Sequence, residues 1–329
     1  MRVKVSFTFL ILAGSIFFTG LTAAQNASKG SGQSYPNRPI RLIVGFPPGG
    51  PADAVARIIV QPVAQQLGQS IVIDNRPGAD GAIAGEMTVK AAPDGYTLFL
   101  ATTSTMSAVP TMRKNPPFNP VRDFTAITDV GRNTWFMFVH PSLPVRTMPE
   151  LINHIRANPG KLSYGSISST AMIATAQLLS LNKLDAVRIP YKGEAPAIPD
   201  LITGRIQFGF MTGVIYLQAR EGRLRVLATL LPKRSALAPE VPTLEEAGVK
   251  GVSTSSWVGL FGPANMPAPL VELLSREFRT ALSRPDVIEG VGRLGLLARG
   301  STPAELTAYV KEQVETWNRV LREAGVPLE

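Results

Sequence analysis

A glycine- and proline-rich segment, residues 46–53 (FPPGGPAD), is the first place where the sequence brings together groups that could bind a ligand. Gly49 and Gly50 let the main chain approach a ligand closely, and Pro51 suits the first position of a helix. The free amide groups of that first helical turn would attract an anion. The alternative is a tight turn in which the charge of Asp53 stabilises the N-terminus of the helix.

Two hydroxyl-rich segments could supply further donors to the same kind of ligand. Residues 102–107 (TTSTMS) and residues 166–171 (SISSTA) each follow an expected strand. Their hydroxyl and amide groups donate hydrogen bonds without carrying a formal charge. Each segment alone is more often a helix cap than a binding site, but three donor-rich segments after three strands indicate a site for a small anion.

Most catalytic and metal chemistry lacks the residues that it needs. The chain of 329 residues has no Cys, which excludes disulfides, thiolate zinc sites, iron–sulfur clusters and a cysteine nucleophile. Its two His, His140 and His154, lie in no motif that makes them general bases. The segment 78–85 (GADGAIAG) only loosely imitates a dinucleotide-binding turn, and the phosphate-loop and G-x-S-x-G motifs are absent. We therefore predict no catalytic residue, no metal and no cofactor.

The elements that must position these segments are short β-branched or aromatic runs that alternate with helical patterns. We predict strands at residues 40–46, 70–75, 96–102, 135–139, 161–166, 187–191, 206–210, 225–230 and 257–261. Between several of them apolar residues recur at helical spacing, as at Ala56, Ile59, Val63 and Leu67. This alternation predicts an α/β fold with parallel sheets covered by helices. Such sheets bind ligands at the carboxyl ends of their strands, where the three segments lie.

The N-terminus is typical of an exported protein. Arg2 and Lys4 precede an uncharged apolar stretch, 7–24, that ends in small residues. We predict that residues 1–24 form a signal peptide cleaved near Ala24, the alternative being a membrane anchor. Residues 25–34 (QNASKGSGQS) are expected to be a flexible leader.

The charge pattern does not indicate nucleic-acid binding. The chain has 33 Lys and Arg against 24 Asp and Glu, but the basic residues are scattered and form no stripe interleaved with aromatic residues. The net charge of +9 favours encounter with small anions or keeps the protein soluble. With 45% hydrophobic and 17% charged residues, the chain can bury a sizeable core.

Several short motifs occur in one order along the chain. They are YPNRPIRLIVGFPPGGPAD at 35–53, NRPGA at 75–79, KAAPDGYTL at 90–98, PSLP at 141–144, NPGKL at 158–162, PYKG at 190–193, VPT at 241–243 and SWVGLF at 256–261. In this order they resemble the substrate-binding receptors of tripartite tricarboxylate transporters, the Bug-type or TctC-type proteins. The resemblance spans nearly the whole mature chain.

The resemblance implies a two-lobe periplasmic-binding-protein (Venus flytrap) fold, in which each lobe is a mainly parallel sheet flanked by helices. The chain of such receptors crosses between the lobes twice, which here implies lobe 1 from residues 35–130 and 256–329 and lobe 2 from residues 131–255. A receptor of this kind works in the bacterial periplasm, where it captures a small organic carboxylate and delivers it to membrane permease subunits. The expected state is a monomer, with no nucleic-acid partner.

The resemblance also implies which residues hold the ligand. In this family strand-to-helix loops grip it between the lobes, largely through backbone amides and ordered waters. These are the donor-rich segments described above, and the residues carried over are Phe46, Pro47, Gly49, Gly50, Asp53, Thr103, Ser104, Ser166, Ser168, Ser169, Thr170 and Ala171.

Two departures from the family pattern bear on the ligand. Met211 and Thr212, followed by Gly213, stand where many members carry Asp-Asn. We include Met211 and Thr212 among the binding residues and expect a more apolar wall there, at which a ligand amine loses a partner. This favours a mono- or dicarboxylate, aromatic or otherwise partly apolar, over citrate. Asp80 stands where glycine is usual, and we expect it at the surface.

Two other classes of function stay open. In a sensory protein, the closed lobes would engage a sensor kinase instead of a permease, and the same sequence could serve either role. A secreted enzyme acting on a small acid would need a polar catalytic constellation, and the sequence offers none based on His, Cys or a metal.

Overall fold

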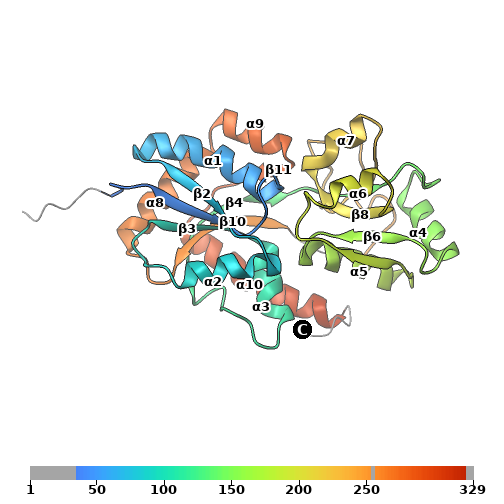
Figure 1. Cartoon of the computed structure of the whole chain (residues 1–329), viewed down its shortest axis with the longest axis horizontal. Helices are drawn as coiled ribbons and strands as arrows, with labels where there is room; N and C mark the ends of the chain where they lie inside the picture. Colours follow the sequence, from blue (N-terminus) through green and yellow to red (C-terminus); the bar gives the residue numbers. More distant parts are fainter. Residues whose placement is uncertain (1–34, 253–255, 324–329) are drawn as a thin grey trace, which may run out of the picture. The chain divides into compact units, whose positions relative to one another are not determined.

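Two β-sheets, each flanked by helices, form the framework of the protein (Figure 1). The computed structural model describes residues 35–252 and 256–323. The predicted signal peptide and leader, residues 1–34, lie outside the described residues. The alternation of strands and helices confirms the α/β class expected from the sequence.

The first sheet has six strands in the order β11-β4-β10-β3-β1-β2. They are β1 (Ile40–Val44), β2 (Ile71–Asn75), β3 (Thr97–Thr102), β4 (Phe124–Asn133), β10 (Trp257–Pro263) and β11 (Leu296–Ala298). Strand β1 pairs in parallel with β2 and β3, whereas β10 lies antiparallel between β3 and β4. Because β10 comes after the whole of the second sheet in the sequence, the chain leaves the first sheet and returns to it.

Helices cover both faces of the first sheet. The helix α1 (Pro51–Leu67) packs with α8 (Ala268–Leu282) and α9 (Pro285–Arg293). In Figure 1 the other face is covered by α2 (Ala82–Val89), α3 (Val109–Met112) and α10 (Pro303–Glu323). Of the apolar positions of α1 predicted from helical spacing, Ala56, Ile59 and Val63 are fully buried and Leu67 is half-buried.

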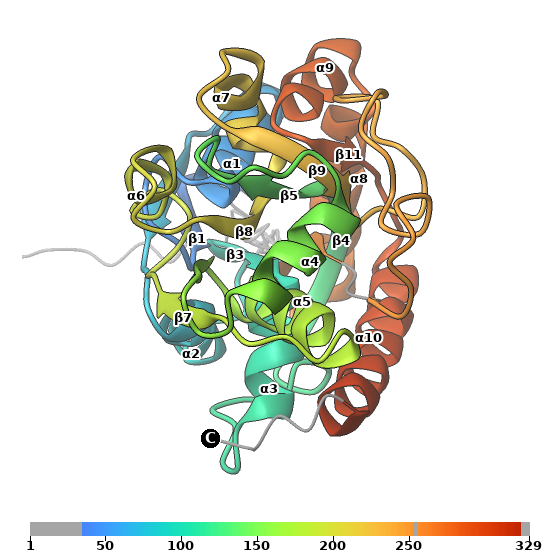
Figure 2. The ribbon, with the colours of Figure 1, turned by 90° about the vertical axis from the view of Figure 1, so that its right-hand side faces the viewer.

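The second sheet has five strands in the order β7-β6-β8-β5-β9. They are β5 (Trp135–Val139), β6 (Ser163–Ser166), β7 (Val187–Pro190), β8 (Phe208–Thr212) and β9 (Arg225–Thr229). Strand β6 is parallel to β7 and β8, and β5 is antiparallel to β8 and β9. This pairing places Trp135 directly opposite Thr212. Figures 1 and 2 show α4 (Met148–Ala157) and α5 (Ser169–Leu181) on one side of this sheet and α6 (Ile198–Ile202) and α7 (Tyr216–Arg220) on the other.

Each sheet has its own hydrophobic core. Phe99 and Trp257 belong to the core against the first sheet, and Phe136 and Phe208 belong to the core of the second. Two separate cores with one sheet each are what a two-lobe protein requires. We call these bodies the first and the second lobe.

All nine predicted strands are present, and two strands were not predicted. The sequence of β4 contains Asp129 and Arg132, which the alternation pattern does not favour in a strand. The structure tolerates them because Arg132 Nη1 donates to Asp129 Oδ1 at 2.7 Å and Asp129 N donates to Ser301 Oγ at 3.0 Å. The other strand, β11, has only three residues. The first passage between sheets falls between Asn133 and Trp135, and the lobe boundaries given from the sequence stay predictions.

Candidate functional site

The loop between β1 and α1 contains the first group of predicted binding residues and is braced by one of them, Asp53. The carboxylate oxygen Oδ2 of Asp53 accepts hydrogen bonds from Gly49 N at 3.0 Å and from Arg57 Nε at 2.9 Å. Gly49 has φ +77°, a left-handed conformation that favours glycine. Burial alone raises the pKa of Asp53, but the hydrogen bonds from Arg57 and Gly49 outweigh it and hold the pKa below its usual value. The geometry thus favours the structural alternative for Asp53, in which its charge organises the loop.

Two side-chain pairs connect loops of the two lobes. The hydroxyl oxygens of Ser104, in the π-helical turn η2 (Ser104–Ala108), and Thr170, in α5, are 3.1 Å apart. Ser169 donates a hydrogen bond to the carboxylate of Asp80. Asp80 is therefore not the surface residue that we expected, because this contact with α5 leaves it half-buried. The donor-rich segments picked out in the sequence do meet.

Some of the predicted hydroxyl groups are also occupied structurally. Thr103 Oγ1 accepts a hydrogen bond from Trp257 N at 2.7 Å, which ties the second loop to β10. Ser168 caps α5, since its hydroxyl oxygen accepts a hydrogen bond from Ala171 N at 3.3 Å. The capping role left open in the sequence therefore applies to Ser168, which also faces the cavity described next.

The loops enclose a small cavity, which we call the cleft cavity, with a volume of about 60 Å³. This volume has room for roughly four to six water-sized groups. Its described wall consists of Phe46, Pro51, Ala52, Val55, Thr102, Ser104, Asn133, Trp135, Ile167, Ser168, Thr170, Gly193, Glu194, Thr212, Ser256 and Val258. Among the predicted binding residues, those that line it are Phe46, Ser104, Ser168, Thr170 and Thr212.

A second, larger pocket adjoins the cleft cavity and shares Phe46, Ser168 and Gly193 with it. We call it the outer pocket; its volume is about 250 Å³. The predicted residues Pro47, Ser166 and Ser169 line it, together with Arg113, Arg188 and Lys192. Of the remaining predicted residues, Gly49, Gly50, Asp53, Thr103, Ala171 and Met211 do not line the described wall of either space.

Two residues that line the cleft cavity each have a buried polar atom without a partner among the described residues. The atoms are Nε1 of Trp135 and Oγ1 of Thr102. Trp135 is 5% exposed, so its N–H group is cut off from solvent as well. A buried donor without a hydrogen bond costs on the order of 1–3 kcal/mol, and a ligand that accepts the bond recovers this cost. The sequence predicts Trp135 in a strand, and no pattern in it indicates a binding residue at this position.

Glu194 is the other residue that the sequence analysis missed. Its side chain is 4% exposed on the wall of the cleft cavity. Oε1 accepts a hydrogen bond from Thr212 N and Oε2 one from Thr212 Oγ1, both at 2.6 Å. Burial raises the pKa of Glu194 to about 7, although the two bonds from Thr212 act to lower it. No ion pair among the described residues includes Glu194, so its charge has no direct partner there.

The carboxyl group of Glu194 adds an acid beside Thr212 that the sequence did not lead us to expect. We expected an apolar surface at Met211 and Thr212, because the acidic residue found in many family members is absent from that position. Much of the wall of the cleft cavity is apolar, and the carboxyl group of Glu194 on Thr212 adds one titratable group to it. The sequence did contain an indication that Glu194 could lie at the site, because this residue directly follows the PYKG motif at the carboxyl end of a strand.

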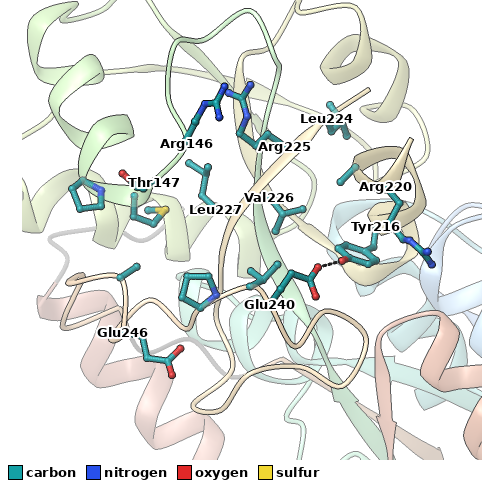
Figure 3. Close-up of a pocket in the computed structure, with 16 residues that line it drawn as sticks. Arg146, Thr147, Tyr216, Arg220, Leu224, Arg225, Val226, Leu227, Glu240 and Glu246 are labelled. Carbon is teal, nitrogen blue, oxygen red and sulfur yellow. Dashed lines mark hydrogen bonds between the residues drawn. The ribbon is translucent and has the colours of Figure 1, made fainter. Parts of the chain in front are cut away.

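A much larger hollow, of about 800 Å³, lies elsewhere on the second lobe (Figure 3). Most of its charged side chains, among them Arg146, Arg220 and Glu240, are exposed. Tyr216 donates its hydroxyl hydrogen to Glu240 in this hollow. None of the predicted binding residues lines its described wall. We place the candidate site in the cleft cavity because its buried donors lack partners, whereas size alone distinguishes the larger hollow.

Metal and membrane features were sought over the same residues. Within residues 35–252 and 256–323, no cluster of three or more His, Asp or Glu is arranged to hold a metal ion. In those ranges no helix combines the length and the apolar character that crossing a membrane requires.

Two helix-flanked sheets, with a cavity where their loops meet, define a two-lobe solute-binding protein. The sequence profile of the tripartite tricarboxylate transporter family receptor matches residues 55–326, and the chain belongs to this family. The family consists of periplasmic solute receptors rather than enzymes.

Individual relatives agree with this assignment. The chain is 33% identical to Protein BugT of Bordetella pertussis over 313 residues, which cover 94% of this chain and 96% of BugT. Its fold is similar to that of the periplasmic binding protein BugD, with 30% identity, a TM-score of 0.85 and coverage of 89% and 99%. The Rhodopseudomonas palustris protein Rpa4515, whose structure was solved with adipate, has 30% identity, a TM-score of 0.85 and coverage of 88% and 98%. The likeness therefore applies to nearly the whole chain.

Proposed function

We propose that this protein is a periplasmic receptor that captures a small organic carboxylate in the cleft cavity and delivers it to a membrane permease of the tripartite tricarboxylate type. The two lobes are residues 35–130 with 256–329, and residues 131–255. Residues 1–24 direct export and are removed near Ala24. The protein acts as a monomer and performs no catalysis.

One observation carries the proposal most strongly: Trp135 lines the cleft cavity, and its buried N–H group has no hydrogen-bond partner among the described residues. A carboxylate oxygen is the natural acceptor for it. The hydroxyl groups of Ser104 and Thr170 line the same cavity and can also donate. The adipate bound by Rpa4515, a similar protein, supports a carboxylate as the ligand.

The energetics are adequate for a transported solute. Each hydrogen bond to a charged group contributes about 1.5–3 kcal/mol. Micromolar affinity requires about −8 kcal/mol in total, and three or four such bonds contribute about 4.5–12 kcal/mol before entropic losses, so apolar contacts and lobe closure would supply the rest. Since the donors on the wall carry no formal charge, opening of the lobes can rehydrate and release the ligand.

The ligand would also control the relation between the lobes. The cleft cavity takes its wall from both lobes, so a ligand touches both of them only when they are close together. Such a ligand shifts the equilibrium toward the closed form. The hydrogen bonds Ser104–Thr170 and Ser169–Asp80 would add to the stability of that form.

The test of ligand class is titration calorimetry with carboxylates and their neutral amides, for example succinate and succinamide. We expect binding of at least one carboxylate and no competition from its amide. Equal competition by the amide would contradict the proposal, because a neutral compound lacks the charge that the donors are placed to bind. The mature chain has three Trp, so the Trp135→Phe variant shows how much of a ligand-induced fluorescence change comes from the cavity.

The test of the partner is capture of detergent-solubilised membrane proteins on the immobilised receptor, with and without its ligand. Ligand-dependent capture of permease subunits supports delivery to a transporter. Ligand-dependent capture of a sensor kinase instead would contradict that part of the proposal and leave carboxylate binding in place.

A further inference from the structure

We propose that the cleft cavity selects a small zwitterion, an amino carboxylic acid, and that the carboxylate of Glu194 binds its ammonium group. This inference rests on the proposed function, because it concerns the ligand of the same cavity. It goes further by assigning two neighbouring groups on the wall, Trp135 and Glu194, to the two charges of the ligand.

The geometry around Glu194 leaves it free to accept further hydrogen bonds. Thr212 N and Thr212 Oγ1 each occupy one carboxyl oxygen. Every carboxylate oxygen can accept about two hydrogen bonds, so each retains a place for a ligand donor. Both bonds come from β8, and they fix the carboxyl group on the wall of the cavity rather than let it turn to solvent.

The charge around Glu194 points to a cation. Among the described residues that line the cleft cavity there is no Lys, Arg or His, and Glu194 is the single acid. Burial raises its pKa and the Thr212 hydrogen bonds act against this rise, with no contribution from a neighbouring charge. Asp53, another acid near the site, is already bound to Arg57 and lies off the wall. A ligand ammonium group would supply the missing counter-charge.

A plain carboxylate would fit the cavity less well. It would place a second negative charge within a space of about 60 Å³ that already contains Glu194. One of the two acids would then have to take up a proton. In a zwitterion the carboxylate can lie against Trp135 Nε1 and the hydroxyl groups while its ammonium group lies against Glu194, so both charges are compensated.

Trp135 and Glu194 are placed to bind the two charged groups of one small molecule. Trp135 lies opposite Thr212 in the β5–β8 pairing, and Thr212 holds Glu194. Directly opposed side chains on antiparallel strands are near neighbours. Trp135, with its unpartnered N–H group, and Glu194, which has no counter-charge among the described residues, are therefore neighbours on the wall, as a short amino acid requires.

The experiment compares molecules that differ only in one substituent. L-Alanine, L-lactate and propionate share one carbon skeleton, and L-aspartate, L-malate and succinate share another. Their dissociation constants are measured by calorimetry for the wild-type protein, for Glu194→Gln and for Glu240→Gln. The last variant is the matched control, because Glu240 is an exposed acid hydrogen-bonded to Tyr216 in the larger hollow, away from the cleft cavity.

In at least one set, we expect the amino compound to bind at least tenfold more tightly than the hydroxy and unsubstituted compounds. Glu194→Gln should lower its affinity at least tenfold and change that of the unsubstituted acid by less than threefold. Glu240→Gln should change none of these affinities by more than twofold. The wild-type comparison alone tests the preference, so the result does not depend on the folding of a variant.

Three results would overturn the inference. They are equal or tighter binding of the unsubstituted acid, a preference for the hydroxy compound, and an amino preference that survives in Glu194→Gln. Each of these leaves carboxylate binding, and so the proposed function, intact. If none of the six compounds binds, the inference and the proposed ligand class fail together.

Discussion

The buried carboxyl group of Glu194 should make the stability of the ligand-free protein depend on pH. Burial raises its pKa from 4.5 to about 7 in the folded state, against the opposing effect of the hydrogen bonds from Thr212. In the unfolded chain the pKa returns to its ordinary value. Below about pH 4.5 the group is protonated in both states. As the pH rises to about 7, the unfolded state releases its proton first, so the folded state loses stability relative to it.

The size of this effect follows from the difference in pKa. One pKa unit corresponds to about 1.4 kcal/mol, so the rise from 4.5 to about 7 corresponds to a loss of about 3 kcal/mol. The loss is complete above about pH 7.5, where the group is ionised in both states. Such a loss is a large part of the free energy of unfolding, which is roughly 5–15 kcal/mol for typical folded domains.

Urea unfolding of ligand-free wild-type protein and Glu194→Gln, at intervals from pH 4.5 to pH 8.5, measures this loss. Gln preserves an acceptor for Thr212 N but has no proton to release in this range. We expect the stability of the wild type relative to Glu194→Gln to fall by about 3 kcal/mol across the interval. Parallel stability curves for the two proteins would refute the reasoning, because they would mean that Glu194 titrates in the folded protein as it does in the unfolded chain.

Three further substitutions test other parts of the site. Trp135→Phe keeps an aromatic ring and removes the unpaired N–H donor, so calorimetry should show a carboxylate affinity lowered about tenfold. The control is Trp317→Phe, in a separate hydrophobic cluster, which should leave the affinity unchanged. Gly50→Val should weaken ligand binding at least tenfold while the thermal unfolding temperature stays within a few degrees of the wild-type value. The Cβ atom of the new side chain would lie 3.3 Å from Pro47 O and so alter the first loop. Unaltered affinity would show that the loop does not contribute to binding. Asp53→Asn should lower the free energy of unfolding by about 1 kcal/mol at pH 7, measured in urea, and the difference from the wild type should shrink below about pH 4. The reason is that a carboxyl group with a lowered pKa stabilises the folded state only while it is ionised. A difference independent of pH would contradict the role of the Asp53 charge in organising the loop.

Much of the fold was predictable because its strands are strongly β-branched or aromatic. β5, for example, is a run of five apolar residues that belongs in a strand under any tertiary arrangement. β4 could not be predicted, because the partners that make Asp129 acceptable in a strand come from a distant part of the chain, at Ser301, as well as from Arg132. Local patterns carry no information about such tertiary compensation.

The candidate site was predictable where it depends on loops after parallel strands. Ser104, Ser168 and Thr170 were found in this way and line the cleft cavity. Trp135 was missed because it begins an antiparallel strand, and only the pairing with β8 brings it to the site. Glu194 was missed because its burial, and with it its raised pKa, depends on contact with Thr212, 18 residues further along the chain.

A crystal structure of the protein with a ligand whose binding has been verified by calorimetry tests the central claim most directly. The account predicts electron density for the ligand in the cleft cavity, with a carboxylate oxygen within hydrogen-bonding distance of Trp135 Nε1. Density for the ligand in the hollow beside Arg146 and Arg220, with the cleft cavity filled by water alone, would contradict it.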